Sequence, residues 1–184
     1  AIANVNKALD LDKNNLEPMK TLAAIYTAQG NEDKALDVQM EYLSKSKKAT
    51  SSDYAALAST YIAKAEGITD RAAKNEVLAK AIAVYEDMIT KFPSISDWIW
   101  LNEANAAQLM NDPDKVADIY KKVAAFEEAK PSLDEDSKSY LENVYYGLGY
   151  YNSKKGNKQE ADEYYNKVLK VNPNNENAKK ALGM

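Results

Sequence analysis

The sequence predicts an all-α protein made of antiparallel helix pairs. Its 184 residues include only six glycines and five prolines, so helix-breaking residues are scarce and long helices are expected. In many segments apolar residues recur three and four positions apart, the spacing of one helix face. Pairs of residues also return after about one repeat length, because Leu57-Ala58 lies 35 residues after Leu22-Ala23. A period of this size is typical of stacked helical repeats.

Residues 143–175 contain the clearest repeat. The residues that mark it are Leu148, Gly149, Gly156, Ala161, Tyr165, Val168 and Pro173. They follow the order of the tetratricopeptide signature, in which L-G, a turn, a small residue, an aromatic residue and a proline occur within one period of 34 residues. The chain therefore resembles the tetratricopeptide-repeat (TPR) family. The resemblance implies a right-handed α-α superhelix, a TPR solenoid of about four antiparallel helix pairs with partial helices at both ends.

The resemblance predicts a single TPR-like solenoid over residues 1–184. Its expected parts are a truncated repeat at 1–15, repeats at about 16–49, 51–93, 96–130 and 132–175, and a capping helix at 176–184. The second and fourth repeats are longer than one period by roughly 12 and 11 residues, or about three helical turns each. We therefore expect lengthened helices rather than irregular insertions, and two of them should meet at Gly67-Ile68.

The first elements follow the same pattern. Residues 2–11 place apolar side chains on one helical face and should form the second helix of the truncated repeat. In the next pair, Pro18 is tolerated in a first helical turn, and Gly30 supplies the turn with positive φ. Gln39 stands where an aromatic residue is usual and Tyr42 where a small one is usual, so this second helix should pack less regularly.

Several residues predict where later helices begin. Thr69 is the expected N-cap of the lengthened second helix. Asn111 replaces the turn glycine, which is acceptable because asparagine adopts the left-handed conformation readily. Asp112-Pro113 should start the following helix, and residues 131–134 should begin another long one. Between 96 and 111 there is no L-G pair, and Glu103 falls near the leucine position.

Small side chains are expected where helices approach closely, and large ones around them. The predicted small contact residues are Ala23, Ala35, Ala58, Ala81, Gly149 and Ala161. The tyrosines expected in the core are Tyr26, Tyr61, Tyr85, Tyr120 and Tyr165.

The composition argues against catalysis. Cysteine and histidine are both absent, which excludes disulfides, thiolate nucleophiles, Cys/His zinc sites and histidine-dependent triads within these residues. The segment 10–14 begins like a calcium loop, but Asn15 and Thr21 stand where that loop needs glycine and glutamate. The acidic run 134–136 complements a helix dipole. We expect no catalytic residue, no metal and no cofactor, so the protein is predicted not to be an enzyme.

Eight residues form the predicted binding surface. They share one face of two first helices, the face that lines the concave groove in TPR proteins. They are Trp98, Leu101, Asn105, Gln108, Asn143, Tyr146, Tyr150 and Lys154. Aromatic rings beside amide side chains suit an extended peptide or a sugar. The alternative is that these residues of lengthened helices cover each other in packing.

Some TPR proteins hold a partner's C-terminal carboxylate with lysine and asparagine on successive first helices. Here Lys20 occupies one such position, but Ala24 and Ala56 stand where asparagines would be. Binding of this kind is therefore not expected.

The leading functional prediction is a non-catalytic scaffold that binds a peptide or protein segment in the concave groove. The alternatives are a carbohydrate- or small-ligand-capturing module of a bacterial envelope protein, and a module for self-association. A net charge of −4 without a basic stripe argues against nucleic acid, and no apolar run is long enough to span a membrane. The chain begins without methionine, as if inside a helix of something longer. The composition looks bacterial, in the cytoplasm or the cell envelope.

Overall fold

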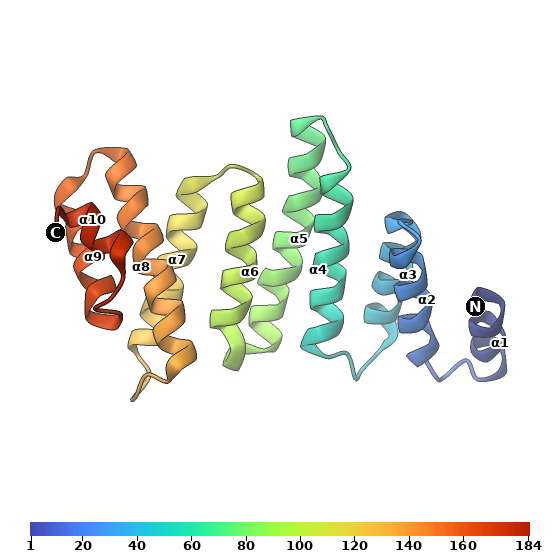
Figure 1. Ribbon diagram of the computed structural model, residues 1–184. Helices are drawn as coiled ribbons and strands as arrows, with labels where there is room; N and C mark the ends of the chain where they lie inside the picture. Colours follow the sequence, from blue (N-terminus) through green and yellow to red (C-terminus); the bar gives the residue numbers. More distant parts are fainter. The chain divides into compact units, whose positions relative to one another are not determined.

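The computed structural model describes residues 1–184 and contains ten α-helices, one short 3-10 helix and no strand (Figure 1). The all-α prediction is therefore confirmed. The chain divides into two units, residues 1–93 and residues 94–184, and each is described by itself. The prediction of one continuous solenoid over the whole chain stays a prediction.

The first unit contains two helix pairs, each running up and down as a hairpin, and one preceding helix (Figure 1). Its helices are α1 (Ile2–Leu11), α2 (Glu17–Ala28), α3 (Glu32–Lys45), α4 (Ser51–Glu66) and α5 (Arg71–Lys91). Each helix packs against the next along the chain. α4 ends just before Gly67, and α5 is a long helix of 21 residues.

The second unit repeats this arrangement and ends with one additional short helix. Its elements are α6 (Ser96–Leu109), α7 (Pro113–Glu128), α8 (Glu135–Lys155), α9 (Lys158–Val171) and α10 (Glu176–Leu182). The 3-10 helix η1 (Pro93–Ile95) connects the two units along the chain. Each of the five helices packs against its neighbour in sequence order, and α8, like α5, has 21 residues.

Polar side chains fix the beginnings of several helices. Asp70, Asp112 and Asp134 each accept a hydrogen bond from a backbone N–H three residues later, at 2.7 to 3.0 Å. Such caps satisfy N–H groups that have no partner within the helix. The prediction of Thr69 as the N-cap of α5 was wrong, because Asp70 supplies that cap. Because Asp134 caps α8, this helix begins at residue 135. The prediction that it begins within residues 131–134 was therefore slightly too early.

The tight turns use the left-handed conformation where the sequence predicted it. Gly30 and Gly156 have φ angles of +65° and +81°. Asn111 has a φ of +57° and is the non-glycine residue with positive φ. It follows α6 and precedes Asp112, the cap of α7.

Small residues lie at the predicted helix contacts. Ala35, Ala58 and Ala81 are fully buried in the first unit, and Ala161 is 2% exposed in the second. Gly149 lies directly against the ring of Tyr165, so that a Cβ atom there would stand 2.7 Å from the ring carbon Cε1. The close approach of α8 and α9 therefore requires glycine at this position.

The tyrosines predicted in the core do not all lie there. Tyr61, Tyr85 and Tyr165 are buried as expected. Tyr26 and Tyr120 are only half-buried. The second helix of this pair carries Lys34 opposite Tyr26. The Lys34 ammonium lies 5.5 Å from the centroid of the Tyr26 ring, so the ring packs against a charged side chain rather than an apolar one. Tyr42, where a small residue is usual, is buried instead.

None of the helices combines the length and the apolar character that crossing a lipid bilayer requires.

Candidate functional site

The eight residues predicted to form a binding surface all lie in the second unit, on α6 and α8. Helix α6 carries Trp98, Leu101, Asn105 and Gln108, and helix α8 carries Asn143, Tyr146, Tyr150 and Lys154. Within each helix the spacings of three, four and seven residues put the side chains on one face. Tyr150 is the most exposed aromatic side chain of the set, at 53%, and Trp98 is 39% exposed.

Three of the eight residues line one cavity of about 330 Å³. These are Gln108 at the end of α6, and Tyr150 and Lys154 on α8. The Lys154 ammonium lies 5.2 Å from the centroid of the Tyr150 ring. The Gln108 side chain donates a hydrogen bond of 2.9 Å from Nε2 to the hydroxyl of Tyr120, which also lines the cavity. The structure therefore brings together an amide, two phenol rings and a cation.

The other five residues lie outside this cavity. Leu101 and Tyr146 are half-buried and pack against the hydrophobic core of the unit. The Tyr146 ring lies 5.7 Å from that of Tyr165, so for this residue the packing alternative describes the contacts better. Trp98, Asn105 and Asn143 are exposed but do not line the cavity.

Sequence reasoning missed several residues of the cavity. Tyr120 was assigned to the core, but its hydroxyl faces Gln108, and burial raises the pKa of this phenol although the hydrogen bond from Gln108 lowers it. Gly147 of α8 packs against the Tyr120 ring, and a Cβ atom at this position would stand 2.3 Å from the ring. The positive-φ residue Asn111 also lines the cavity. Its position in the turn between α6 and α7, where glycine is usual, is the sequence signal that could have identified it as a cavity residue.

An ion pair closes one edge of the same cavity. Asp114 at the start of α7 accepts a hydrogen bond from the Tyr151 hydroxyl at 2.6 Å and pairs with the Lys155 ammonium at 2.9 Å. These two partners hold the pKa of Asp114 below its ordinary value. The contacts join the first turn of α7 to the last turn of α8, and Tyr151 and Lys155 line the cavity at this end.

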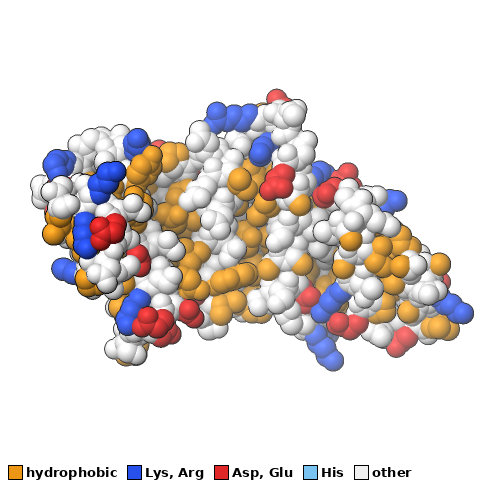
Figure 2. All heavy atoms as spheres, in the orientation of Figure 1, with side chains coloured by type: hydrophobic (Ala, Val, Ile, Leu, Met, Phe, Trp, Pro, Cys, Tyr) orange, Lys and Arg blue, Asp and Glu red, His pale blue; other side chains and the backbone are white.

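Helix α6 presents a surface without charge. Its acidic residues, Asp97 and Glu103, are both buried. In Figure 2 the visible side of α6 is accordingly free of red and blue side chains. Asp97 pairs with Lys130 at 3.1 Å, and the same ammonium binds the fully buried Glu127 at 2.8 Å. The acidic groups of this region therefore stabilise the fold and leave the helix face neutral.

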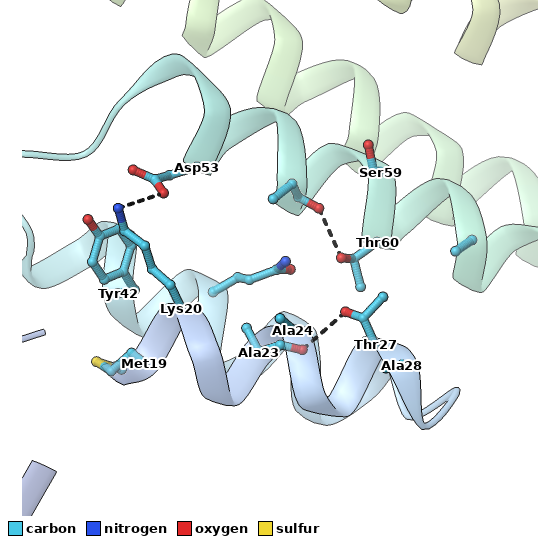
Figure 3. A pocket seen from close by; sticks show the side chains of 13 residues that line it. Met19, Lys20, Ala23, Ala24, Thr27, Ala28, Tyr42, Asp53, Ser59 and Thr60 are labelled. Atoms are coloured by element: carbon cyan, nitrogen blue, oxygen red, sulfur yellow. Dashed lines mark hydrogen bonds and ion pairs between the residues drawn. The ribbon is translucent and has the colours of Figure 1, made fainter. Parts of the chain in front are cut away.

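The first unit contains a larger cavity, of about 590 Å³, that the sequence did not indicate (Figure 3). Side chains of α2 and α4 lie on its opposite sides, and two residues of α3 close its back. It is lined by Met19, Lys20, Ala23, Ala24, Thr27, Ala28, Gln39, Tyr42, Asp53, Ala56, Ser59, Thr60 and Ala63. Most of these side chains are small or apolar.

Lys20, the residue compared with a carboxylate-binding lysine, lies at one end of this cavity. Its ammonium pairs with Asp53 at 3.1 Å (Figure 3). It also pairs with Glu17 at 3.4 Å. Burial lowers the pKa of Lys20, but the neighbouring Tyr42 and Asp53 raise it above the ordinary value. Lys20 is therefore a charged residue that already has carboxylate partners.

No group of three or more acidic side chains converges in a way that could hold a metal ion. The residues that line the two cavities offer hydrogen-bonding groups, charged groups, aromatic rings and apolar surface.

Comparison with known families gives one match. Residues 142–175, which include the last two thirds of α8 and all of α9, match the model of the family described as "Tetratricopeptide repeat". Those two helices are a TPR pair. Within the pair, Gly149 of α8 and Tyr165 of α9 are the residues whose contact brings the helices together.

Solved TPR structures share the fold over most of the chain. A thermophilic TPR protein of Thermus thermophilus is 20% identical and matches with a TM-score of 0.54, covering 98% of this chain and 88% of the other. A structure of MamA is 21% identical, with a TM-score of 0.55 and coverages of 99% and 84%. A tetratricopeptide-repeat protein from Parabacteroides merdae is 15% identical, with a TM-score of 0.60 and coverages of 91% and 57%.

These likenesses show that the chain has a TPR fold, as its sequence resemblance implied. A search among curated proteins finds no match. In general the TPR fold serves as a scaffold for protein interactions.

Proposed function

We propose that this protein is a non-catalytic interaction scaffold that binds a peptide or protein segment along the α6–α8 face. The observation that carries the proposal is the cavity shared by Gln108, Tyr150 and Lys154, because these residues were selected from helical spacing and the TPR resemblance and they line one cavity. Exposed aromatic rings with polar groups nearby are typical of binding surfaces. A neutral helix face beside them favours contact with apolar or uncharged segments.

The test is partner capture by the full chain and by two variants. Tyr150→Ala/Lys154→Ala removes exposed side chains from the cavity, and Leu133→Ala truncates an exposed apolar side chain that lies outside it. Peptides selected from a random display library on the parent protein should bind the first variant at least about tenfold more weakly, as expected for loss of an interface anchor. The Leu133 variant should bind as the parent does. Equal binding by all three proteins would refute the proposed surface.

A carbohydrate ligand is a second candidate for the same cavity. It is favoured by the exposed Tyr150 ring beside the amides of Gln108 and Asn111, since sugars combine apolar faces with many hydroxyls. A glycan array probed with the parent and with Tyr150→Ala distinguishes it from a peptide. Self-association is tested by light scattering over a range of concentrations, where a rising mass would favour assembly.

A further inference from the structure

Met40 of α3 is exposed to solvent and has a specific polar neighbour on the next helix. Its side chain is 42% exposed, and its sulfur accepts a hydrogen bond of 3.4 Å from the hydroxyl of Tyr61 on α4. The bond joins the second helix of one helix pair to the first helix of the next. Neither residue lines the two cavities described above.

The Tyr61 hydroxyl donates only to this sulfur. Tyr61 is 9% exposed, and its ring belongs to a hydrophobic cluster with Leu36, Leu57 and Ala81. The Met40 sulfur is the one hydrogen-bond partner that the structure gives its hydroxyl. A thioether is a weak acceptor, whereas a buried phenol normally finds a good one. The donor is therefore in place for a stronger acceptor at the position of the sulfur.

The other four methionines have different surroundings. Met19 and Met88 are buried, at 5% and 0% exposure, and Met110 is half-buried after α6. Met184 is 79% exposed and lies beyond the last helix. Met40 is therefore the exposed methionine within a helix, and a reagent in solvent reaches its sulfur without any opening of the fold.

The thioether of an exposed methionine reacts with peroxides. A sulfur lone pair attacks one peroxide oxygen, so that an S–O bond forms and the O–O bond breaks. The proton of the transferred oxygen passes to the leaving oxygen, and with hydrogen peroxide the products are methionine sulfoxide and water. The sulfur loses two electrons and the peroxide gains them. Sulfoxide reductases return the product to methionine, so the modification is reversible.

The sulfoxide oxygen suits the Tyr61 hydroxyl better than the thioether does. It is polar and carries partial negative charge, which makes it a stronger hydrogen-bond acceptor than a thioether sulfur. Methionine has three rotatable side-chain bonds, and rotation about Cγ–Sδ turns the new oxygen toward the hydroxyl. A sulfoxide usually disrupts packing because it places a polar group in an apolar core. Here the side chain is exposed, and its polar neighbour is a buried donor.

From these observations we infer that Met40 is a site of reversible oxidation by peroxides and that Tyr61 binds the sulfoxide that forms. Oxidation then strengthens the contact between α3 and α4 instead of disrupting it. The junction between the α2–α3 and α4–α5 helix pairs is accordingly firmer in the oxidised protein. This inference goes beyond the proposed scaffold function and does not depend on it.

The first measurement is the rate of oxidation of each methionine in the folded full chain. The protein is treated with hydrogen peroxide and digested with trypsin, which cuts after lysine and leaves each of the five methionines in its own peptide. Mass spectrometry should show Met40 oxidised at least about tenfold faster than Met88, which a reagent reaches only when the unit opens. Equal rates for the two residues would refute the assignment of Met40 as the reactive site.

The second measurement is hydrogen–deuterium exchange of the backbone amides of α3 and α4, before and after oxidation. A stronger hydrogen bond between the helices should slow exchange about two- to fivefold in the oxidised protein. Unchanged or faster exchange would show that the sulfoxide does not strengthen the contact, and the inference would be wrong.

Two variants identify the cause of the slower exchange. Tyr61→Phe removes only the hydroxyl, so Met40 should still be oxidised but exchange should no longer slow. Met40→Leu cannot be oxidised at this position, and peroxide should leave its α3 and α4 exchange unchanged although the other exposed methionine still reacts. If oxidation slowed exchange equally in the parent and in either variant, Tyr61 and the Met40 sulfoxide would not be the interacting groups, and the inference would be overturned.

Discussion

Replacement of Gly149 by alanine tests the packing on which the second unit depends. The new Cβ atom would stand 2.7 Å from Cε1 and 2.9 Å from Cδ1 of the Tyr165 ring, well inside van der Waals contact. Tyr165 is 5% exposed and its ring is backed by Tyr146, so it has little room to retreat. Overpacking costs about 1–3 kcal/mol, and the higher helix propensity of alanine returns about 1 kcal/mol. We expect a net loss of about 1 kcal/mol in the free energy of unfolding.

Urea unfolding followed by tryptophan fluorescence is the appropriate assay. Both tryptophans lie in α6, within the second unit, so the signal reports the unit that contains Gly149. A loss of about 1 kcal/mol lowers the midpoint by roughly 0.5 M urea. If Gly149→Ala unfolded at the same or a higher urea concentration than the parent, α8 and α9 would not approach as described.

Two further variants control for the cause. At Gly67 of the first unit, φ is −76° and a new Cβ atom would meet only the Lys64 carbonyl oxygen, at 3.6 Å. Gly67→Ala, followed by far-ultraviolet circular dichroism because the tryptophans report only the second unit, should leave stability unchanged or raise it by up to about 1 kcal/mol. In a Tyr165→Leu background the obstructing ring is gone, and Gly149→Ala should then cost clearly less. A cost that persisted in that background would point to a source other than the ring.

Three other predictions concern the second unit. Ala161→Leu should lower the free energy of unfolding by about 1–3 kcal/mol through overpacking, because Ala161 is 2% exposed between helices; an unchanged melting curve would refute its assignment as a contact residue. Lys130→Met should cost about 2 kcal/mol in urea unfolding, since it leaves Asp97 and the buried Glu127 without their cation; a neutral result would show that this ammonium does not compensate them. Although burial acts in the opposite direction, the hydrogen bond from the Trp98 N–H and the Lys130 ammonium hold the pKa of Asp97 below its ordinary value of 3.8. The stabilisation by Asp97 is therefore fully present above that value and is lost as pH falls through the lower folded pKa. The stability difference between the parent and Asp97→Asn should accordingly shrink as pH is lowered from about 5 to 3, and a difference independent of pH would contradict this role.

Much of the fold follows from local pattern. The period of small and large residues predicted which helices pair, and it placed Ala161 and Gly149 at contacts that the structure contains. Helix beginnings were less predictable, because neighbouring residues such as Thr69 and Asp70 are both good caps. Which of them acts depends on backbone angles that the sequence pattern does not specify.

The candidate sites were also predicted only in part from the sequence. Helical spacing, together with the TPR resemblance, selected Gln108, Tyr150 and Lys154, which line one cavity in the structure. It could not show that Tyr120 is only half-buried, because Tyr165, the tyrosine at the equivalent position of the α8–α9 pair, is buried. The α2–α4 cavity was missed altogether, since exposed alanines resemble packing alanines in sequence. A cavity depends on the placement of three helices together, which no single segment specifies.

Asn111 combines a conformational cost with a place in the α6–α8 cavity. Its φ of +57° would be easier for glycine, which the chain uses after α2 and α8, yet here it carries a carboxamide that lines the cavity. Residues that keep an unfavourable backbone are often retained for what their side chains do. Replacement of Asn111 by glycine should therefore raise the stability of the protein and lower its affinity for a ligand in the α6–α8 cavity. One turn residue would then affect both properties in opposite directions.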